Sequence, residues 1–269
     1  MKFGICTSFR TVQNLKEVNF DYLEESVQRF LIPEHPQEDF ENNLRAIRQL
    51  PFPVEAVNSL LPSDLVLVAT SERQIDTVRL ENYMRTTLRR ADQAQIRVIV
   101  FGSGNARACP IGYDKATAAQ QIQEHLATWS YWASNYGIQI VIEPLRYEET
   151  NLFNTVAETG EMIARIANSG ARLLADIYHM ACNQEEPASI LPNATLLKHV
   201  HVAEKQNRAA PGHYGEDLRP YFAALQQAEY DQRISIECNW TDFAHEVHPA
   251  IEVLKQQWSE AKLLSTRLT

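Results

Sequence analysis

The sequence predicts an α/β fold, a closed (β/α)8 TIM barrel that forms one domain over residues 1–269. Three observations support this prediction. Eight apolar, strand-like runs alternate with helical segments along the chain, with no linker or low-complexity tract between them. The best of these runs are continuously apolar, which is typical of parallel sheets covered on both faces. A barrel of this kind needs about 250 residues, and the chain has 269.

The first half of the chain contains four of the expected strands. They are the runs Phe3–Thr7, Tyr22–Val27, Val54–Leu61 and Arg97–Phe101. Pro62 closes the third run and Gly102 follows the fourth. Helices are expected at Phe40–Leu50 and Arg79–Ala94, because apolar residues recur there at helical spacing.

The second half alternates in the same way, and capping residues mark its helices. Asp114 is expected to cap a helix that ends near Gly137, and Thr155-x-x-Glu158 forms a capping box for the next helix. Strands are expected at Ile138–Ile142, Leu173–Asp176, His199–Val202 and Ile234–Glu237. The remaining helices are expected near Pro187–Leu197, Leu218–Ala228 and Pro249–Leu264.

A doubly wound open sheet is the rival fold for such alternation. That fold usually carries a glycine-rich phosphate-binding turn after its first strand. Here the end of the first strand and the residues after it read Cys6-Thr7-Ser8-Phe9, which contain no glycine. The closed barrel is therefore the better prediction.

Composition narrows the class of protein. A formal net charge of −9 argues against nucleic acid as the main partner, since phosphate binding needs clustered Lys and Arg. The four cysteines contain no CxxC pair, which favours reduced thiols in a cytoplasmic protein. No signal peptide or membrane span is recognisable, so no membrane partner is expected. A homo-oligomer is left open.

Four consecutive strand-like runs end in a side chain that can bind a metal. These side chains are Glu143, Asp176, His201 and Glu237. A lone buried carboxylate is very unfavourable, so each needs a cation, a hydrogen-bond network or access to water. In a closed barrel the carboxyl ends of all strands surround one mouth, where the chemistry of such enzymes takes place. We therefore expect the four side chains to converge.

Three carboxylates and one imidazole form a hard, mixed oxygen and nitrogen site. Such a site suits one divalent ion, Mn²⁺, Mg²⁺, Co²⁺ or Zn²⁺, and differs from thiolate-rich zinc sites. An octahedral ion with four protein ligands keeps two positions for a substrate such as a hydroxyketone. The ion would polarise the carbonyl and stabilise an enediolate, while Glu143 and Glu237 serve as the acid/base pair.

Taken alone, each residue has a simpler explanation. A glutamate at a strand end is usually a salt-bridge partner, and His201 alone would be a hydrogen-bonded core histidine. His179 would be a loop residue, and Arg107 and Arg208 would be surface charges. The coincidence on four successive strands favours the metal site over these separate explanations.

Several motifs then resemble a known family. They are Phe101-Gly102-Ser103-Gly104, Glu143-Pro144-Leu145 with Glu149 and Asn154-Thr155, Asp176-x-x-His179, His199-x-His201 with Glu204, and Ile236-Glu237. The chain is similar to the xylose-isomerase-like TIM-barrel sugar isomerases and epimerases. The resemblance is greatest to the branch of ketose 3-epimerases and hydroxypyruvate isomerases, and it is most specific between Val98 and Glu237.

The resemblance implies roles for individual residues. It implies that Glu143, Asp176, His201 and Glu237 bind one divalent ion, commonly manganese, and that Glu143 and Glu237 transfer the proton. It further implies that Glu149, His179 and Arg208 contact substrate or support the metal ligands. The chain departs from the family pattern at Arg146-Tyr147, at Cys238-Asn239-Trp240, and by one extra residue between His201 and Arg208.

The expected function is that of a metal-dependent isomerase or epimerase of a free sugar or small hydroxy-carbonyl compound. A dehydratase of a polyol ketone on the same barrel is the alternative. An endonuclease IV-like DNA-repair enzyme and a non-catalytic sugar or metal sensor rank lower. Arg107, Arg146 and Arg208 leave open a substrate that carries a carboxylate or a phosphate.

Overall fold

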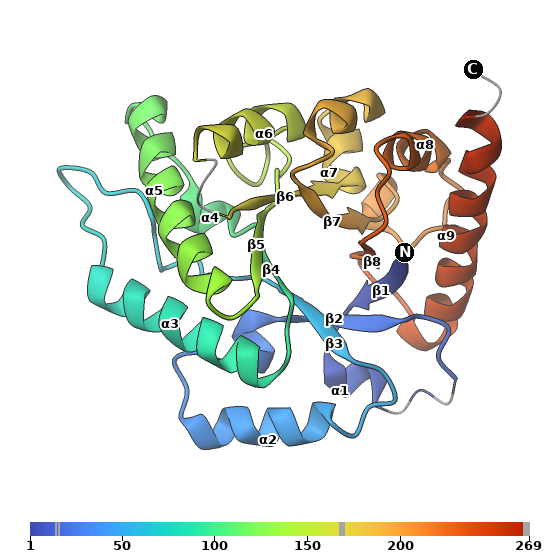
Figure 1. Ribbon diagram of the computed structural model, residues 1–269, viewed down its shortest axis with the longest axis horizontal. Helices are drawn as coiled ribbons and strands as arrows, with labels where there is room; N and C mark the ends of the chain where they lie inside the picture. The colour runs from blue at the N-terminus through green and yellow to red at the C-terminus, as the bar shows by residue number, and fades with distance from the viewer. Residues whose placement is uncertain (14, 16, 167–169, 266–269) are drawn as a thin grey trace.

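The fold is a closed barrel of eight parallel strands surrounded by helices (Figure 1). The computed structural model describes residues 1–13, 15, 17–166 and 170–265. Each strand pairs with its neighbours in sequence, and the first pairs with the last, so the sheet has no free edge. The strands are β1 Lys2–Cys6, β2 Tyr22–Ser26, β3 Val54–Asn58, β4 Val98–Phe101, β5 Gln139–Ile142, β6 Arg172–Asp176, β7 Leu197–Val202 and β8 Arg233–Ile236.

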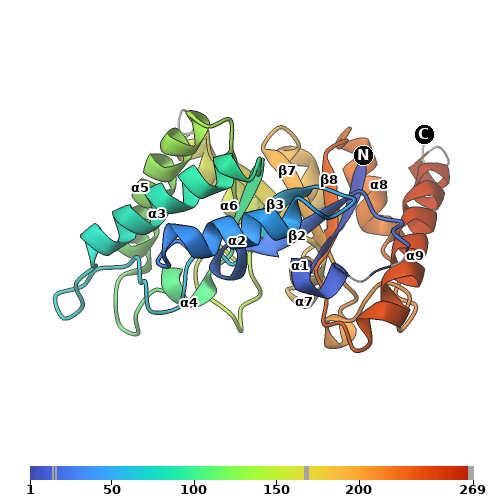
Figure 2. The ribbon, with the colours of Figure 1, turned by 90° about the horizontal axis from the view of Figure 1, so that it is seen from below.

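An outer layer of helices covers the barrel, as the two views in Figures 1 and 2 show. Its long members are α2 Gln37–Ile47, α3 Thr77–Gln93, α5 Lys115–Ser134, α6 Val156–Arg165, α8 Arg219–Gln227 and α9 Phe243–Ser265. Shorter helices lie in the connections between these elements: α1 Phe9–Val12, the π-helix η1 Val27–Leu31, α4 Gly104–Arg107, α7 Ile177–Cys182, and the 3-10 helices η3 Pro187–Asn193 and η4 Gln206–Arg208.

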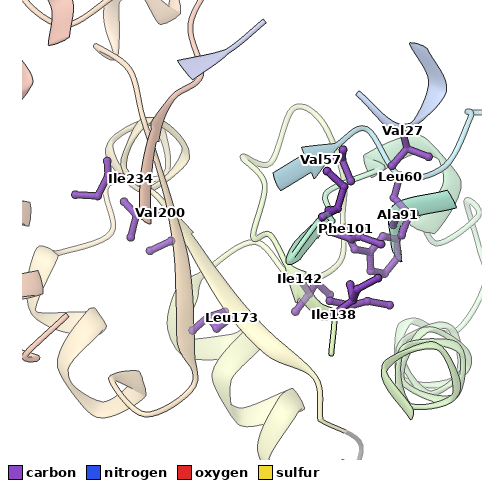
Figure 3. Packing of buried hydrophobic residues seen from close by; sticks show 14 of the residues in the cluster. Val27, Val57, Leu60, Ala91, Phe101, Ile138, Ile142, Leu173, Val200 and Ile234 are labelled. Carbon is purple, nitrogen blue, oxygen red and sulfur yellow. The ribbon is translucent and has the colours of Figure 1, made fainter. Parts of the chain in front are cut away.

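Alternating side chains of the strands pack into two separate cores. Those that point inward fill the barrel with a small cluster of Tyr22, Ala56, Val98, Val100, Val141 and Leu174. Those that point outward, such as Val57, Phe101 and Ile142, belong to the larger core between strands and helices (Figure 3). A strand buried on both faces is apolar at nearly every position, which explains the continuous apolar runs in the sequence.

Aromatic contacts tie the first strand to the last helices. The Trp258 ring of α9 lies 6.3 Å from Phe3 of β1 and 5.7 Å from Phe222 of α8, both edge-to-face. These contacts pack the last helix against β1, whose pairing with β8 closes the barrel. No helix in the described ranges has the length and apolar character needed to cross a membrane.

The expected capping residues lie where the sequence predicted, with one difference. Asp114 accepts a hydrogen bond from the backbone N–H of Thr117 at 2.7 Å, and Thr155 accepts one from Glu158 at 3.0 Å. The Glu158 carboxylate, however, accepts from the backbone N–H of Asn154 at 2.8 Å. In a standard capping box the Glu158 carboxylate would accept from the N–H of the N-cap residue Thr155. Here it accepts from the residue before Thr155.

Some expected element bounds were wrong. The third strand ends at Asn58 rather than Leu61, because Ser59 adopts a left-handed conformation with φ +52° and turns the chain outward. The second strand ends at Ser26 and continues as a π-helix. The expected helix near Pro187–Leu197 is a 3-10 helix that ends at Asn193.

The last helix begins at Phe243, before the expected start at Pro249. The backbone N–H groups of His245 and Glu246 bond to the carbonyl of Asp242, at 3.1 and 2.9 Å. These bonds form the extra turns ahead of the proline.

Candidate active site at the carboxyl ends of the strands

Four side chains from four adjacent strands meet at the carboxyl end of the barrel. Ligand atoms of Glu143, Asp176, His201 and Glu237 all lie within 4.8 Å of one another. Asp176 ends β6 and His201 lies on β7, while Glu143 and Glu237 directly follow β5 and β8. The first three are buried, and the Glu237 side chain keeps 22% of its surface exposed. The convergence expected from the sequence is present in the structure.

His201 faces two of these carboxylates through one ring nitrogen. Its Nδ1 lies 3.2 Å from Glu143 Oε1 and 3.1 Å from Glu237 Oε2. Adjacent ligands of an octahedral ion with bonds of about 2.1 Å stand roughly 3 Å apart. The separations among His201, Glu143 and Glu237 therefore fit a divalent ion bound between them. Their oxygen and nitrogen atoms are suitable ligands for such an ion.

Asp176 is oriented by the helix that follows it. As the N-cap of α7, it accepts a hydrogen bond on Oδ1 from the backbone N–H of Tyr178 at 2.9 Å. Its Oδ2 then faces the site, 3.3 Å from His179 Nε2 and 3.0 Å from Arg208 Nη2. One carboxylate thus ends a strand, caps a helix and presents its second oxygen to the cluster.

The structure brings His179 directly to the cluster. The backbone N–H of Arg146 donates to His179 Nδ1 at 3.3 Å, so the neutral ring carries its proton on Nε2, which points at Asp176. Burial lowers the pKa of His179 to about 4, against the opposing effect of Glu143. The ring is therefore a neutral hydrogen-bond donor at pH 7.

Arg208 also reaches the cluster, despite the extra residue before it. Asn207 and Arg208, at the end of the short helix η4, both adopt positive φ, +58° and +51°. Arg208 Nη2 contacts Glu237 Oε2 as well as Asp176. Its guanidinium lies 4.6 Å from the Tyr178 ring.

Glu149 is not one of the side chains that meet in the four-residue cluster. Its carboxylate accepts a hydrogen bond from Arg146 Nε at 2.7 Å, and both side chains are about one-third exposed. This pair lies in the loop after β5, above the buried ligand set.

The titration behaviour of the two glutamates differs. Burial raises the pKa of Glu143, and the nearby Glu237 raises it further. Burial acts in the same direction on Glu237, but His201 and Arg208 outweigh it and lower its pKa to about 2. Two carboxyl groups with separated pKa values are typical of an acid/base pair.

Asn58 is a site residue that the sequence analysis missed. Its side-chain amide donates to Glu237 Oε1 at 2.6 Å, across the mouth from β3. Because Oε1 is held by Asn58, Oε2 is the oxygen that faces His201. The expected strand end at Leu61 had hidden this residue, since Asn58 would then have lain within the strand.

The segment after β4 shapes the space around Glu143. A side-chain carbon on Gly102 would lie 2.5 Å from Glu143 Oε2, so a larger residue there would have to displace this carboxylate. Arg107 is fully buried and donates from Nη2 to the backbone carbonyl of Glu143 at 2.7 Å. The interpretation of Arg107 as a surface charge was therefore wrong. The segment after Phe101 instead positions Glu143 at the end of the neighbouring strand, β5.

Fold and site together define a single-domain TIM barrel with a mixed carboxylate and histidine centre at its mouth. A family model described as the xylose isomerase-like TIM barrel matches residues 12–259. The chain belongs to this family.

Relatives with known names match parts of the chain. An L-ribulose 3-epimerase of Methylomonas sp. (strain DH-1) is 29% identical over 147 residues, 47% of this chain and 51% of that protein. A 3-dehydro-D-guloside 4-epimerase of Escherichia coli (strain K12) is 26% identical over 119 residues, 44% of this chain and 45% of that protein. The aligned part of the chain spans about half the length of these curated relatives.

Solved structures match the whole fold. A D-allulose 3-epimerase from Methylomonas sp. in complex with D-allulose superposes with a TM-score of 0.79 at 17% identity, over 96% of this chain and 97% of that one. An IOLI protein with a bound zinc atom gives 0.71 at 14% identity, over 97% and 98%. At these identities the likeness establishes the fold alone.

Proposed function

We propose that this protein is a divalent-metal-dependent isomerase or epimerase of a free sugar or small hydroxy-carbonyl compound. The observation that carries the proposal is the meeting of Glu143, Asp176, His201 and Glu237 within 4.8 Å. The names of the relatives, which include L-ribulose 3-epimerase and ketose 3-epimerase, support the same class of substrate.

The same four side chains would hold the metal ion. Three carboxylates and one imidazole suit Mn²⁺, Mg²⁺, Co²⁺ or Zn²⁺, with Mn²⁺ favoured by the family resemblance. When bound, the ion supplies Lewis-acid polarisation of a substrate carbonyl and stabilises the charge of an enediolate.

Glu237 and Glu143 would transfer the proton. Glu237, ionised because its pKa is about 2, takes the proton from the carbon beside the carbonyl, and the bonding electrons form the enediolate. Glu143, whose pKa is raised by burial, supplies a proton to a carbon of that intermediate. Protonation of the same carbon on its opposite face gives an epimer. Protonation of the neighbouring carbon, with transfer of the hydroxyl proton from one enediolate oxygen to the other, gives an isomer.

Other residues at the mouth would orient the substrate. The neutral His179 offers its Nε2–H to a substrate oxygen, and Arg208 offers guanidinium N–H groups beside Asp176 and Glu237. Glu149, paired with Arg146, would bind hydroxyl groups farther from the reacting carbon.

The test is exchange of carbon-bound hydrogen with solvent. The protein is incubated with Mn²⁺ and a panel of ketoses, ketose phosphates and sugar acids in D₂O, and the products are analysed by NMR. Deuterium should enter the carbon beside the carbonyl of one class, together with a new epimer or isomer. Glu237→Gln should abolish exchange, whereas the exposed Glu252→Gln should retain it.

Three results would contradict the proposal. If no compound in the panel incorporates deuterium, the proposed proton transfer at carbon is wrong. Loss of water from the substrate would identify a dehydratase instead. Cleavage of an abasic-site duplex would identify a DNA-repair enzyme.

A further inference from the structure

One buried carboxylate below the four-residue cluster contacts its histidine from the other side. Glu24 of β2 is fully buried, and its Oε1 lies 2.9 Å from His201 Nε2. The opposite ring nitrogen, Nδ1, is the one that faces Glu143 and Glu237. His201 therefore lies between a deeper carboxylate and the candidate metal centre.

We propose that Glu24 is a positioning residue that holds His201 with its proton on Nε2 and its Nδ1 free to bind the metal ion. The inference rests on the proposed function. An imidazole that binds a metal through one nitrogen needs an acceptor at the other nitrogen to fix its tautomer and ring orientation. Glu24 supplies that acceptor from a strand outside the four that carry the proposed ligands.

The second oxygen of Glu24 is already occupied, so the carboxylate has one orientation. Its Oε2 lies 2.7 Å from His199 Nε2 and accepts from Ser235 Oγ at 2.6 Å. Both partners are fully buried. With two donors on Oε2, only Oε1 is available to His201.

A further hydroxyl fixes Ser235 in turn. Tyr22 Oη and Ser235 Oγ are 2.7 Å apart. Since Ser235 gives its only O–H to Glu24, Tyr22 must be the donor in this bond. Gly4 makes this arrangement possible, because a side-chain carbon there would overlap the Tyr22 ring. The chain Tyr22–Ser235–Glu24–His201 thus runs from the interior of the barrel to its mouth.

The experiment measures binding of Mn²⁺ alone by calorimetry to wild type, Glu24→Gln and Glu25→Gln. Glu25 is the matched control, because it is the next residue of β2 and equally buried. Its carboxylate instead holds Arg29 and the backbone N–H groups of Ser26 and Phe9. We expect Mn²⁺ affinity to fall about 10- to 100-fold in Glu24→Gln and to stay within about twofold of wild type in Glu25→Gln.

A spectroscopic measurement keeps the proposal testable if Glu24→Gln does not fold. In the Zn²⁺-loaded wild type, ¹⁵N-edited NMR of the histidines should show His201 protonated on Nε2 and metal-bound through Nδ1. The signals are assigned by their loss in His201→Asn. A proton on Nδ1 with the metal on Nε2 would overturn the proposal.

Failure of the inference and failure of the proposed function give different results. If wild type binds one Mn²⁺ and exchanges ketose hydrogen, but Glu24→Gln binds Mn²⁺ equally well, only the role of Glu24 is wrong. If wild type binds no Mn²⁺, the proposed metal centre is wrong and this inference falls with it. Two ions in wild type and one in Glu24→Gln would make Glu24 a ligand with His199 and His201, and would also overturn the positioning role.

Discussion

Carboxylates on both sides hold His201 at the bottom of the candidate site. Each ring nitrogen of His201 lies within 3.2 Å of a carboxylate oxygen. Burial would lower the pKa of His201, but Glu24 and Glu237 outweigh it and raise the pKa well above its ordinary value. A divalent ion on Nδ1 would take the place of a proton there, so metal binding and proton release are coupled at this residue.

At the same scale, Asn58 determines which oxygen of Glu237 faces the metal. Asn58→Ala removes a hydrogen bond to a charged group, an interaction of roughly 1.5–3 kcal/mol. We expect kcat to fall by at least about tenfold, with a smaller change in KM, because Glu237 would lose its orientation. Steady-state kinetics on the accepted ketose would measure this. Asn82→Ala, on the exposed face of α3, should match wild type, and unchanged kinetics in Asn58→Ala would refute the role of Asn58.

Another residue, His125, gives a prediction about pH. Burial lowers the pKa of His125 below its ordinary value, and the ring stacks on Trp129 with centroids 5.4 Å apart. As the pH falls below about 6.5, the unfolded chain takes up a proton more readily than the folded chain, so the free energy of unfolding decreases. Urea unfolding at pH 7.5 and 5.5 should show a smaller loss for His125→Gln than for wild type. An equal decrease in the free energy of unfolding for both proteins would show that His125 does not cause the pH dependence.

At the scale of elements, the turn after β4 is built around the end of β5. Gly102 leaves room for the Glu143 carboxylate, and Arg107 holds the Glu143 carbonyl. Gly104 packs closely against the loop after β5, because a side-chain carbon there would lie 2.6 Å from the backbone carbonyl oxygen of Glu149. The short helix α4 thus positions the strand end beside it.

Gly102→Ala should therefore displace Glu143. We expect Mn²⁺ affinity to fall by at least about tenfold, because the added methyl group would lie 2.5 Å from Glu143 Oε2 and push the carboxylate away. Calorimetry measures the affinity, and circular dichroism checks the fold. Gly112→Ala is the control: it lies in open space at φ +78°, so it should lower stability while leaving Mn²⁺ affinity unchanged. Wild-type affinity in Gly102→Ala would contradict this account.

Much of the element order could be predicted from the sequence, and the limits have physical causes. The runs around Val100 and Ile140 are buried on both faces, so their apolar character marks them as strands. Asn58 could not be located, because the left-handed turn at Ser59 that ends β3 leaves no clear signal in a non-glycine residue. Glu24 lies within an expected strand, but its partners on β7 and β8 are distant in sequence, so its role could not be predicted.

For the whole molecule, the closed barrel brings groups from distant parts of the chain to one mouth. Glu143 and Glu237 are held by Asn58 of β3, Arg107 of α4 and Arg208 of η4. The clustering of carboxylates there opposes folding through like-charge repulsion, which a bound cation would relieve. Metal binding should therefore stabilise the fold as a whole.

The corresponding prediction concerns thermal stability. At a free Mn²⁺ concentration of 100 times Kd, binding to the folded state adds about 2.7 kcal/mol, which for a chain of this size raises Tm by roughly 5–10 °C. Differential scanning fluorimetry with EDTA or Mn²⁺ would measure the shift. It should vanish in Asp176→Asn and persist in Asp217→Asn, which changes an exposed carboxylate. Equal Tm values for wild type in EDTA and Mn²⁺ would contradict the prediction.

The most direct measurement is anomalous X-ray scattering from a crystal of the wild-type protein soaked in Mn²⁺. One peak is expected at the mouth of the barrel, within bonding distance of Glu143, Asp176, His201 and Glu237. A crystal with no peak among these side chains, or with manganese bound elsewhere, would show that they do not form a metal centre.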